Sequence, residues 1–110
     1  MRYYLFDEIS PSDMEKADNF LMQNATSSEI EKLFWVEIPK EFLNEIQSRH
    51  IECQTYFFAV EMGVDWIRVE LFIRSKKGLH CTCQSLCTPR QRDFIFSFID
   101  KMIEDLDIRT

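Results

Sequence analysis

Three of the four cysteines in this 110-residue chain lie within seven positions, in the run HCTCQSLC that spans residues 80–87. Thiolates and imidazoles are the preferred protein ligands of zinc, and an exposed thiolate is also a redox-sensitive nucleophile. The residue types therefore allow a zinc or redox-sensing site at Cys81, Cys83 and Cys87. Cys53, the remaining cysteine, is the natural fourth ligand to consider.

The expected backbone around these thiols disfavours a metal site. Cys81 and Cys83 have CxC spacing on an expected strand, which places their Cα atoms roughly 6.6 Å apart on one face. Cys53 lies three residues before Tyr56, so in an unbroken strand it points to the opposite face, as does His80. We therefore expect neither a metal-ligand set nor a cofactor, and we interpret Cys81 and Cys83 as thiols that pack in the core.

Cys87 differs from the other thiols because it directly precedes an expected helix start at Thr88. The helix N-terminus and the nearby Arg90 and Arg92 can lower the pKa of this thiol, which makes it the candidate for a reactive thiol, with an inert loop thiol as the default interpretation. A catalytic cysteine also needs a base and an oxyanion site, and His80 is expected on the open face of a strand. The chain has no phosphate loop, nucleophile elbow or HExxH motif. These observations predict a protein that is not an enzyme.

Three helices are expected from their start signals and apolar stripes. Ser10 and Pro11 begin a helix over residues 11–24, and Pro39 begins another over 39–49. The third helix covers residues 89–107, with Thr88 as its N-cap and Gln91 closing the capping box.

The strands are expected at residues 2–6 and 33–38, followed by an antiparallel meander at about 54–62, 66–75 and 79–86. A turn on Gly63-Val64 places Val60 opposite Ile67, and a turn one residue later shifts the pairing by two without changing the faces. A turn at residues 76–78 places Ile73 opposite Cys81 and Leu71 opposite Cys83. The prediction is a single α+β domain over residues 1–110, with a mixed sheet.

Charge and hydropathy restrict the partners of this domain. The net charge of −6 argues against nucleic acid and anionic lipid. The N-terminus lacks the pattern of a signal peptide, and no apolar run reaches the roughly 18–20 residues of a membrane span. We therefore expect a cytoplasmic protein with reduced thiols. Residues 66–92 nevertheless carry six basic side chains against one acidic side chain.

One face of the expected meander interleaves arginines with aromatic side chains, as protein-interface hot spots do. We assign binding to five residues of this face: Trp66, Arg68, Phe72, Arg74 and His80. Glu61 and Glu70 share the face, and we expect them to form cross-strand ion pairs. The predicted function is a small acidic module that binds a protein partner or itself, most simply as a homodimer. The alternatives are the thiol site described above and a helix that covers this face.

Overall fold

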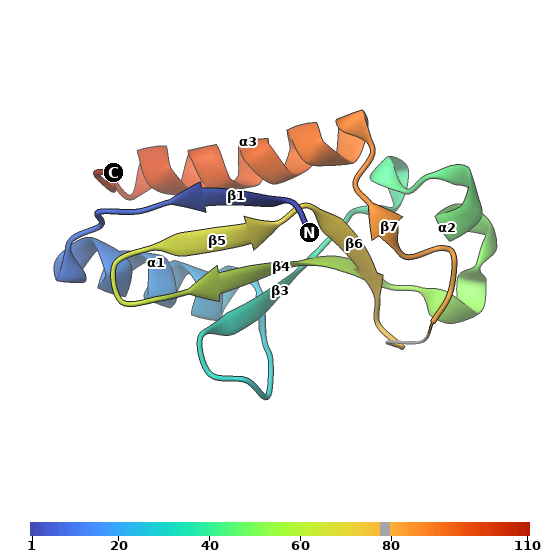
Figure 1. Cartoon of the computed structure of the whole chain (residues 1–110), viewed down its shortest axis with the longest axis horizontal. Helices are drawn as coiled ribbons and strands as arrows, with labels where there is room; N and C mark the ends of the chain where they lie inside the picture. The colour runs from blue at the N-terminus through green and yellow to red at the C-terminus, as the bar shows by residue number, and fades with distance from the viewer. Residues whose placement is uncertain (78–79) are drawn as a thin grey trace.

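A computed structural model describes residues 1–77 and 80–110 of the chain. Its strands are β1 (Tyr3–Phe6), β2 (Thr26–Ser27), β3 (Leu33–Glu37), β4 (Tyr56–Met62), β5 (Ile67–Glu70), β6 (Phe72–Ser75) and β7 (Ser85–Leu86). The helices are α1 (Pro11–Asn24), α2 (Glu45–Arg49) and α3 (Pro89–Asp105), with 3₁₀ turns η1 (Lys40–Phe42) and η2 (Ile51–Cys53). The strand order is β1-β5-β4-β3-β2, and β6 pairs with both β4 and β7 (Figure 1).

This arrangement confirms the expected α+β class, with differences in detail. Every pairing among the described residues is antiparallel, whereas a mixed sheet was expected. The first helix has the predicted bounds, and the last ends at Asp105 instead of residue 107. The expected helix at 39–49 is divided into η1 and α2, because Leu43 is extended and Asn44 caps a new helix.

The hairpin of β4 and β5 uses the second of the two expected registers. Val60 lies opposite Val69, and the Gly63 amide donates to the Trp66 carbonyl at 2.8 Å. The expected strand at 66–75 is interrupted at Leu71. The Leu71 amide donates to the Arg2 carbonyl, while its own carbonyl accepts from the Cys87 amide, so the backbone leaves the ladder with β4 here.

The expected third strand of the meander, residues 79–86, is wrong over most of its length. Of its described residues, 80–86, only Ser85 and Leu86 form a strand, and Ile73 pairs with Ser85 instead of Cys81. The Gln84 side chain accepts a hydrogen bond from the Ser75 amide at 2.7 Å, in place of a strand partner. The expected pairing of Ser75 with Leu79, and the turn through Gly78, lie outside the described residues.

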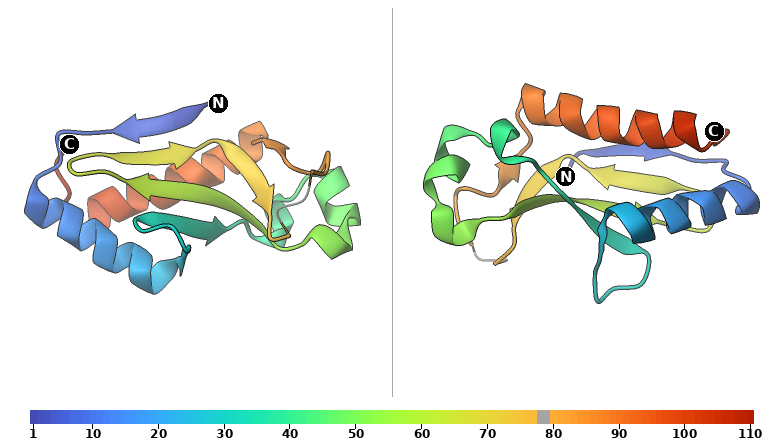
Figure 2. Two further views of the ribbon diagram at one scale, coloured as in Figure 1. Left: turned by 60° about the horizontal axis from the view of Figure 1, so that its bottom comes forward. Right: turned by 180° about the vertical axis from the view of Figure 1, so that it is seen from behind.

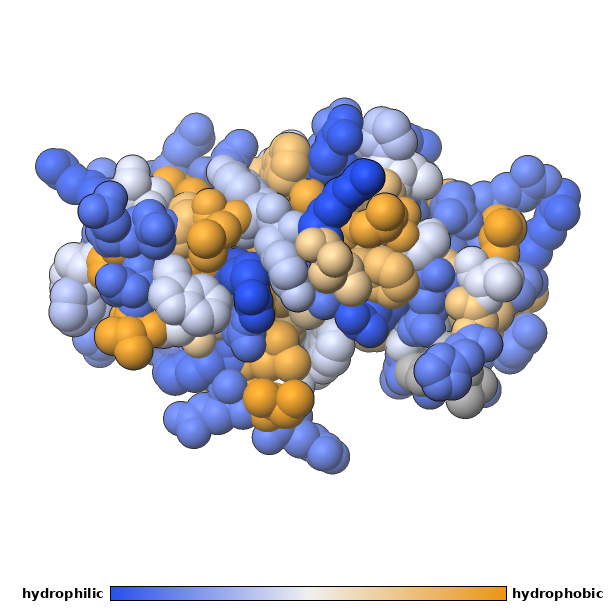
Figure 3. Space-filling model, viewed as in Figure 1, coloured by the Kyte–Doolittle hydropathy of each residue, from blue (hydrophilic) through white to orange (hydrophobic). Residues whose placement is uncertain are grey.

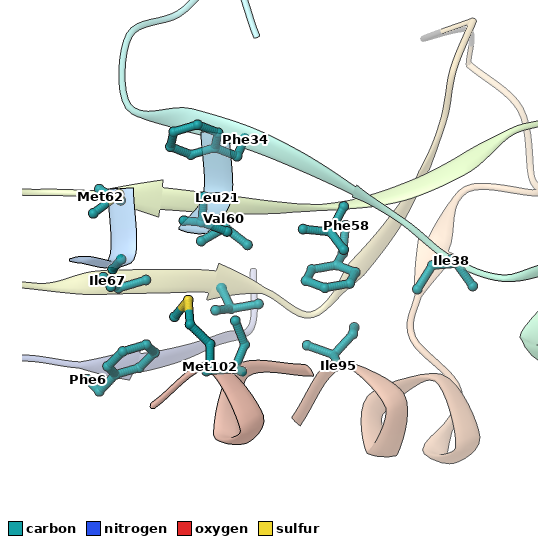
Figure 4. Close-up of a cluster of buried hydrophobic side chains, with 14 of the residues drawn as sticks. Phe6, Leu21, Phe34, Ile38, Phe58, Val60, Met62, Ile67, Ile95 and Met102 are labelled. Atoms are coloured by element: carbon teal, nitrogen blue, oxygen red, sulfur yellow. The ribbon is translucent and has the colours of Figure 1, made fainter. Parts of the chain in front are cut away.

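Helices α1 and α3 both cover one face of the sheet, as the view from behind shows (Figure 2). The core between the layers combines alternate residues of the strands with the apolar stripes of these helices. Its members include Phe6, Leu21, Phe34, Phe58, Val60, Met62, Ile67, Ile95 and Met102 (Figure 4). The opposite face of the sheet carries no described helix (Figure 2). The alternative that a helix covers this face is therefore wrong for the part of the chain that the structure describes.

Two buried glutamines join the N-termini of α2 and α3. Gln47 closes the capping box of Asn44, and Gln91 closes that of Thr88. Both side chains are fully buried, and Gln91 Nε2 donates to Gln47 Oε1 at 2.8 Å and to the Phe42 carbonyl at 3.0 Å. Each amide therefore serves its own helix and the neighbouring segment at once.

Replacing Gln91 by alanine should destabilise the fold by about 2–4 kcal/mol, because it removes a cap and leaves buried polar groups unpaired. Urea unfolding followed by circular dichroism measures this difference. The control is Ser97→Ala on the exposed side of α3, which should change stability by less than about 0.5 kcal/mol. A Gln91→Ala variant as stable as this control would contradict the role given to the glutamine pair.

Candidate functional site

The uncovered face of the sheet, here called the open face, is the surface of the sheet opposite α1 and α3 (Figure 2). Alternation in β5 and β6 turns Ile67, Val69 and Ile73 into the core. The intervening residues Arg68 and Phe72 are therefore on the open face. Figure 3 shows this side, where hydrophobic and charged side chains are interleaved.

Arg68 is the centre of one part of the open face. Its guanidinium pairs with Glu61 on β4 and stacks over the Tyr3 ring, with 4.4 Å from Cζ to the ring centroid. The Trp66 ring lies on the same guanidinium at 5.5 Å. A β-carbon at Gly63 would overlap the Trp66 indole, so glycine permits this close packing.

Arg74 organises the other part of the open face. It forms a bidentate ion pair with Glu70, with nitrogen–oxygen distances of 2.6 and 3.1 Å. Its guanidinium also stacks on the Phe72 ring at 5.0 Å. The expected cross-strand ion pair is confirmed for Glu61, which lies opposite Arg68 on β5. It is wrong for Glu70, which pairs with Arg74 four residues further along the same stretch of chain.

Two adjoining grooves follow the open face, and Trp35 and Arg74 line both of them. The smaller has a volume of about 310 Å³ and includes Tyr3 and Arg68. The larger, of about 480 Å³, contains His80 beside Phe57 and Gln84. Trp66 instead borders a third hollow together with Leu5 and Arg68.

Tyr3 and Trp35 were not among the predicted site residues. Side chains alternate along a strand, so Tyr3 and Leu5 share one face of the first strand. This alternation was a usable signal that Tyr3 lies on the open face. Trp35 was obscured because the strand LFWVE is apolar on both sides, a pattern typical of a strand buried on both faces. In the structure, Phe34 and Val36 enter the core while Trp35 lies on the open face.

A second candidate site lies beside the N-terminal end of β4, which begins at Tyr56. One nitrogen of His50 and the sulfur atoms of Cys53, Cys81 and Cys83 all lie within 4.8 Å of one another. We call these four residues the thiol–imidazole cluster. Three thiols and an imidazole are a donor set that holds soft or borderline metal ions.

Two turns create the cluster. The Cys53 amide donates to the His50 carbonyl at 3.0 Å, and the side chains at positions i and i+3 of such a 3₁₀ turn lie on the same side. The Gln84 amide donates to the Cys81 carbonyl at 3.1 Å, which bends the CxC segment around Thr82. Neither pair of ligands is on a strand.

The expected geometry of the thiols is therefore wrong at two points. Cys53 does not point away from Cys81 and Cys83, because it precedes the strand and strand parity does not apply to it. Cys81 and Cys83 are not on a strand, because their segment turns at Thr82. Cys87, the third residue of the alternative thiol site, is not part of the cluster. Its amide pairs with Leu71 instead. Sequence reasoning missed His50 as a ligand, although its spacing of three residues to Cys53 was a usable signal.

The thiols have different electrostatic surroundings. The Cys83 backbone amide, the Cys83 thiol and His50 lower the pKa of Cys81 to about 7, against the effect of burial. Burial raises the pKa of Cys83, which is fully shielded from solvent. Burial also raises the pKa of Cys87 and outweighs Arg92, so the helix start does not activate this thiol.

None of the described helices combines the length and apolar character that crossing a membrane requires. No family model, curated protein or solved structure matches the chain. The assignment of function therefore depends on the residues of the open face and of the thiol–imidazole cluster.

In metal-free protein that retains its circular dichroism spectrum, Cys81 should be alkylated before Cys87. Only the thiolate reacts, and a pKa of about 7 makes about half of Cys81 thiolate at neutral pH. Iodoacetamide labelling between pH 5 and pH 9, resolved by peptide mass spectrometry, gives both rates. Labelling of Cys81 should rise through pH 7, and that of Cys87 should rise at higher pH. The reverse order would contradict the different surroundings of the two thiols.

Proposed function

We propose that this chain is a cytoplasmic, non-catalytic module that associates with a second copy of itself through the open face. The observation that supports this proposal most is the arrangement of Arg68 and Arg74, each stacked on aromatic rings and paired with a glutamate. Arginine and aromatic side chains dominate binding energy at the centres of protein interfaces.

The apolar content of the open face supports a protein partner. Leu5 is 54% exposed and Ile30 is 64% exposed, although both are large hydrophobic residues. Ile30 lines the smaller groove together with Leu33 and Trp35. A partner that covers these side chains would remove apolar area from water, which favours association.

Charge favours self-association over binding to nucleic acid. The chain carries a net charge of −6, so two copies repel each other over most of their surfaces. On the open face, Glu61 and Glu70 neutralise the two arginines. Two copies can approach there without this repulsion, whereas paired arginines are poor ligands for phosphate.

The double variant Arg68→Glu with Phe72→Ala should convert a dimer into a monomer, because it places unpaired negative charge and a smaller side chain at the centre of the face. Sedimentation velocity over a concentration series measures the assembly. The matched control is Arg92→Glu with Met22→Ala, which makes the same charge reversal and a comparable truncation of a large apolar side chain at exposed helix positions. This control should remain dimeric. A monomeric unaltered protein, or a double variant that still dimerises, would contradict the proposal.

A further inference from the structure

We infer that the thiol–imidazole cluster is a structural zinc site, with Cys53, Cys81 and Cys83 as thiolate ligands and His50 as the imidazole ligand. The three sulfur atoms and the histidine nitrogen come from segments far apart in the sequence, yet all lie within 4.8 Å of one another. This site is separate from the open-face residues Arg68 and Phe72, on which the proposed self-association depends.

The spacing of the donors fits a tetrahedral ion. Zinc bonds of about 2.0–2.3 Å place the donors of a tetrahedral site roughly 3.3–3.8 Å apart. His50 Nδ1 and Cys81 Sγ are already separated by 3.2 Å. The widest donor pair, at up to 4.8 Å, needs to close by about 1 Å, which is within reach of side-chain rotation.

The buried hydroxyl of Tyr56 is a second, independent observation at this site. Tyr56 is 1% exposed, and its hydroxyl has no hydrogen-bond partner among the described residues. The hydroxyl lies beside the Cys83 side chain, one of the residues of the cluster. A zinc-bound thiolate at Cys83 is a strong acceptor and would satisfy this otherwise costly donor.

The backbone of both turns is fixed by groups outside the cluster. The Ser75 hydroxyl donates to the Cys53 carbonyl, and Gln47 Nε2 donates to the Cys83 carbonyl at 3.0 Å. Such supporting hydrogen bonds orient ligands before the metal arrives. Cys53 and Cys83 are buried, while His50 and Cys81 are partly exposed and provide a path for the ion.

The donor chemistry selects zinc and a structural role. Calcium and magnesium require oxygen ligands, whereas the cluster offers sulfur and nitrogen. Four protein ligands fill a tetrahedral shell and leave no position for substrate, which is the pattern of structural zinc. Each thiol would release its proton to solvent as the ion binds. The bound ion would join the turn at His50–Cys53 to the turn at Cys81–Gln84, a segment with little regular structure of its own.

Zinc content of the full chain tests this inference directly. Protein that is stripped with a chelator under reducing conditions and reconstituted should hold one zinc ion per chain, measured by native mass spectrometry. Cobalt(II) in place of zinc should give the intense sulfur-to-metal charge-transfer band of a tetrahedral thiolate site. Cys81→Ser should abolish stoichiometric zinc, whereas the control variants Cys87→Ser and His80→Ala should retain it.

The unaltered protein provides a test that does not depend on the folding of a variant. With zinc bound, Cys81 should resist alkylation at neutral pH, and removal of the zinc by a chelator should restore the reactivity of this partly exposed thiol. Sub-stoichiometric zinc, iron in its place, or thiol reactivity that zinc does not change would overturn the inference. Dimerisation is a separate readout, because Arg68→Glu with Phe72→Ala should leave the zinc content at one per chain.

Tyr56→Phe tests the role of the hydroxyl. If Tyr56 donates to a zinc-bound thiolate, this variant should bind zinc about 10–100-fold more weakly, as measured by competition with a chromophoric chelator. A hydroxyl without this role is an unpaired buried donor, and its removal should leave zinc affinity unchanged. Unchanged affinity would overturn the assignment of Tyr56 to the site.

Discussion

The hydrogen bond between the buried amides of Gln47 and Gln91 is the interaction on which this end of the molecule depends. It links the start of α2 to the start of α3, the helix that covers the sheet. The same Gln47 side chain also binds the Cys83 carbonyl. Because buried amides are costly when unpaired, the cap of one helix, the cap of another and the position of one thiol depend on one another.

The sequence predicted the elements that follow a regular period and failed where the backbone is irregular. Strand alternation correctly separated Arg68 from Val69, and the serine and threonine caps correctly marked the starts of α1 and α3. The thiol–imidazole cluster was missed because strand parity was applied to Cys53 and Cys83. Both residues lie in turns, where a period of two has no meaning.

Long-range hydrogen bonds explain why these turns could not be predicted locally. Nothing near Gln84 indicates that its side chain accepts from the Ser75 amide and thereby replaces a strand partner. Nothing in the sequence indicates that Gln47 contacts Cys83, because the two residues are far apart along the chain. Their hydrogen bond nevertheless fixes the turn at Cys81–Gln84. A pattern within one segment reports its own periodicity, whereas these contacts appear only when the segments are packed.

The two proposed sites share a short piece of backbone. Cys81 and Cys83 belong to the thiol–imidazole cluster, while the adjacent His80 and Gln84 line the larger groove of the open face. An ion that fixes the turn between them would also fix the shape of that groove. A pre-organised surface loses less conformational entropy when a partner binds. Zinc at one end of the sheet would therefore favour association on the open face without contacting the partner.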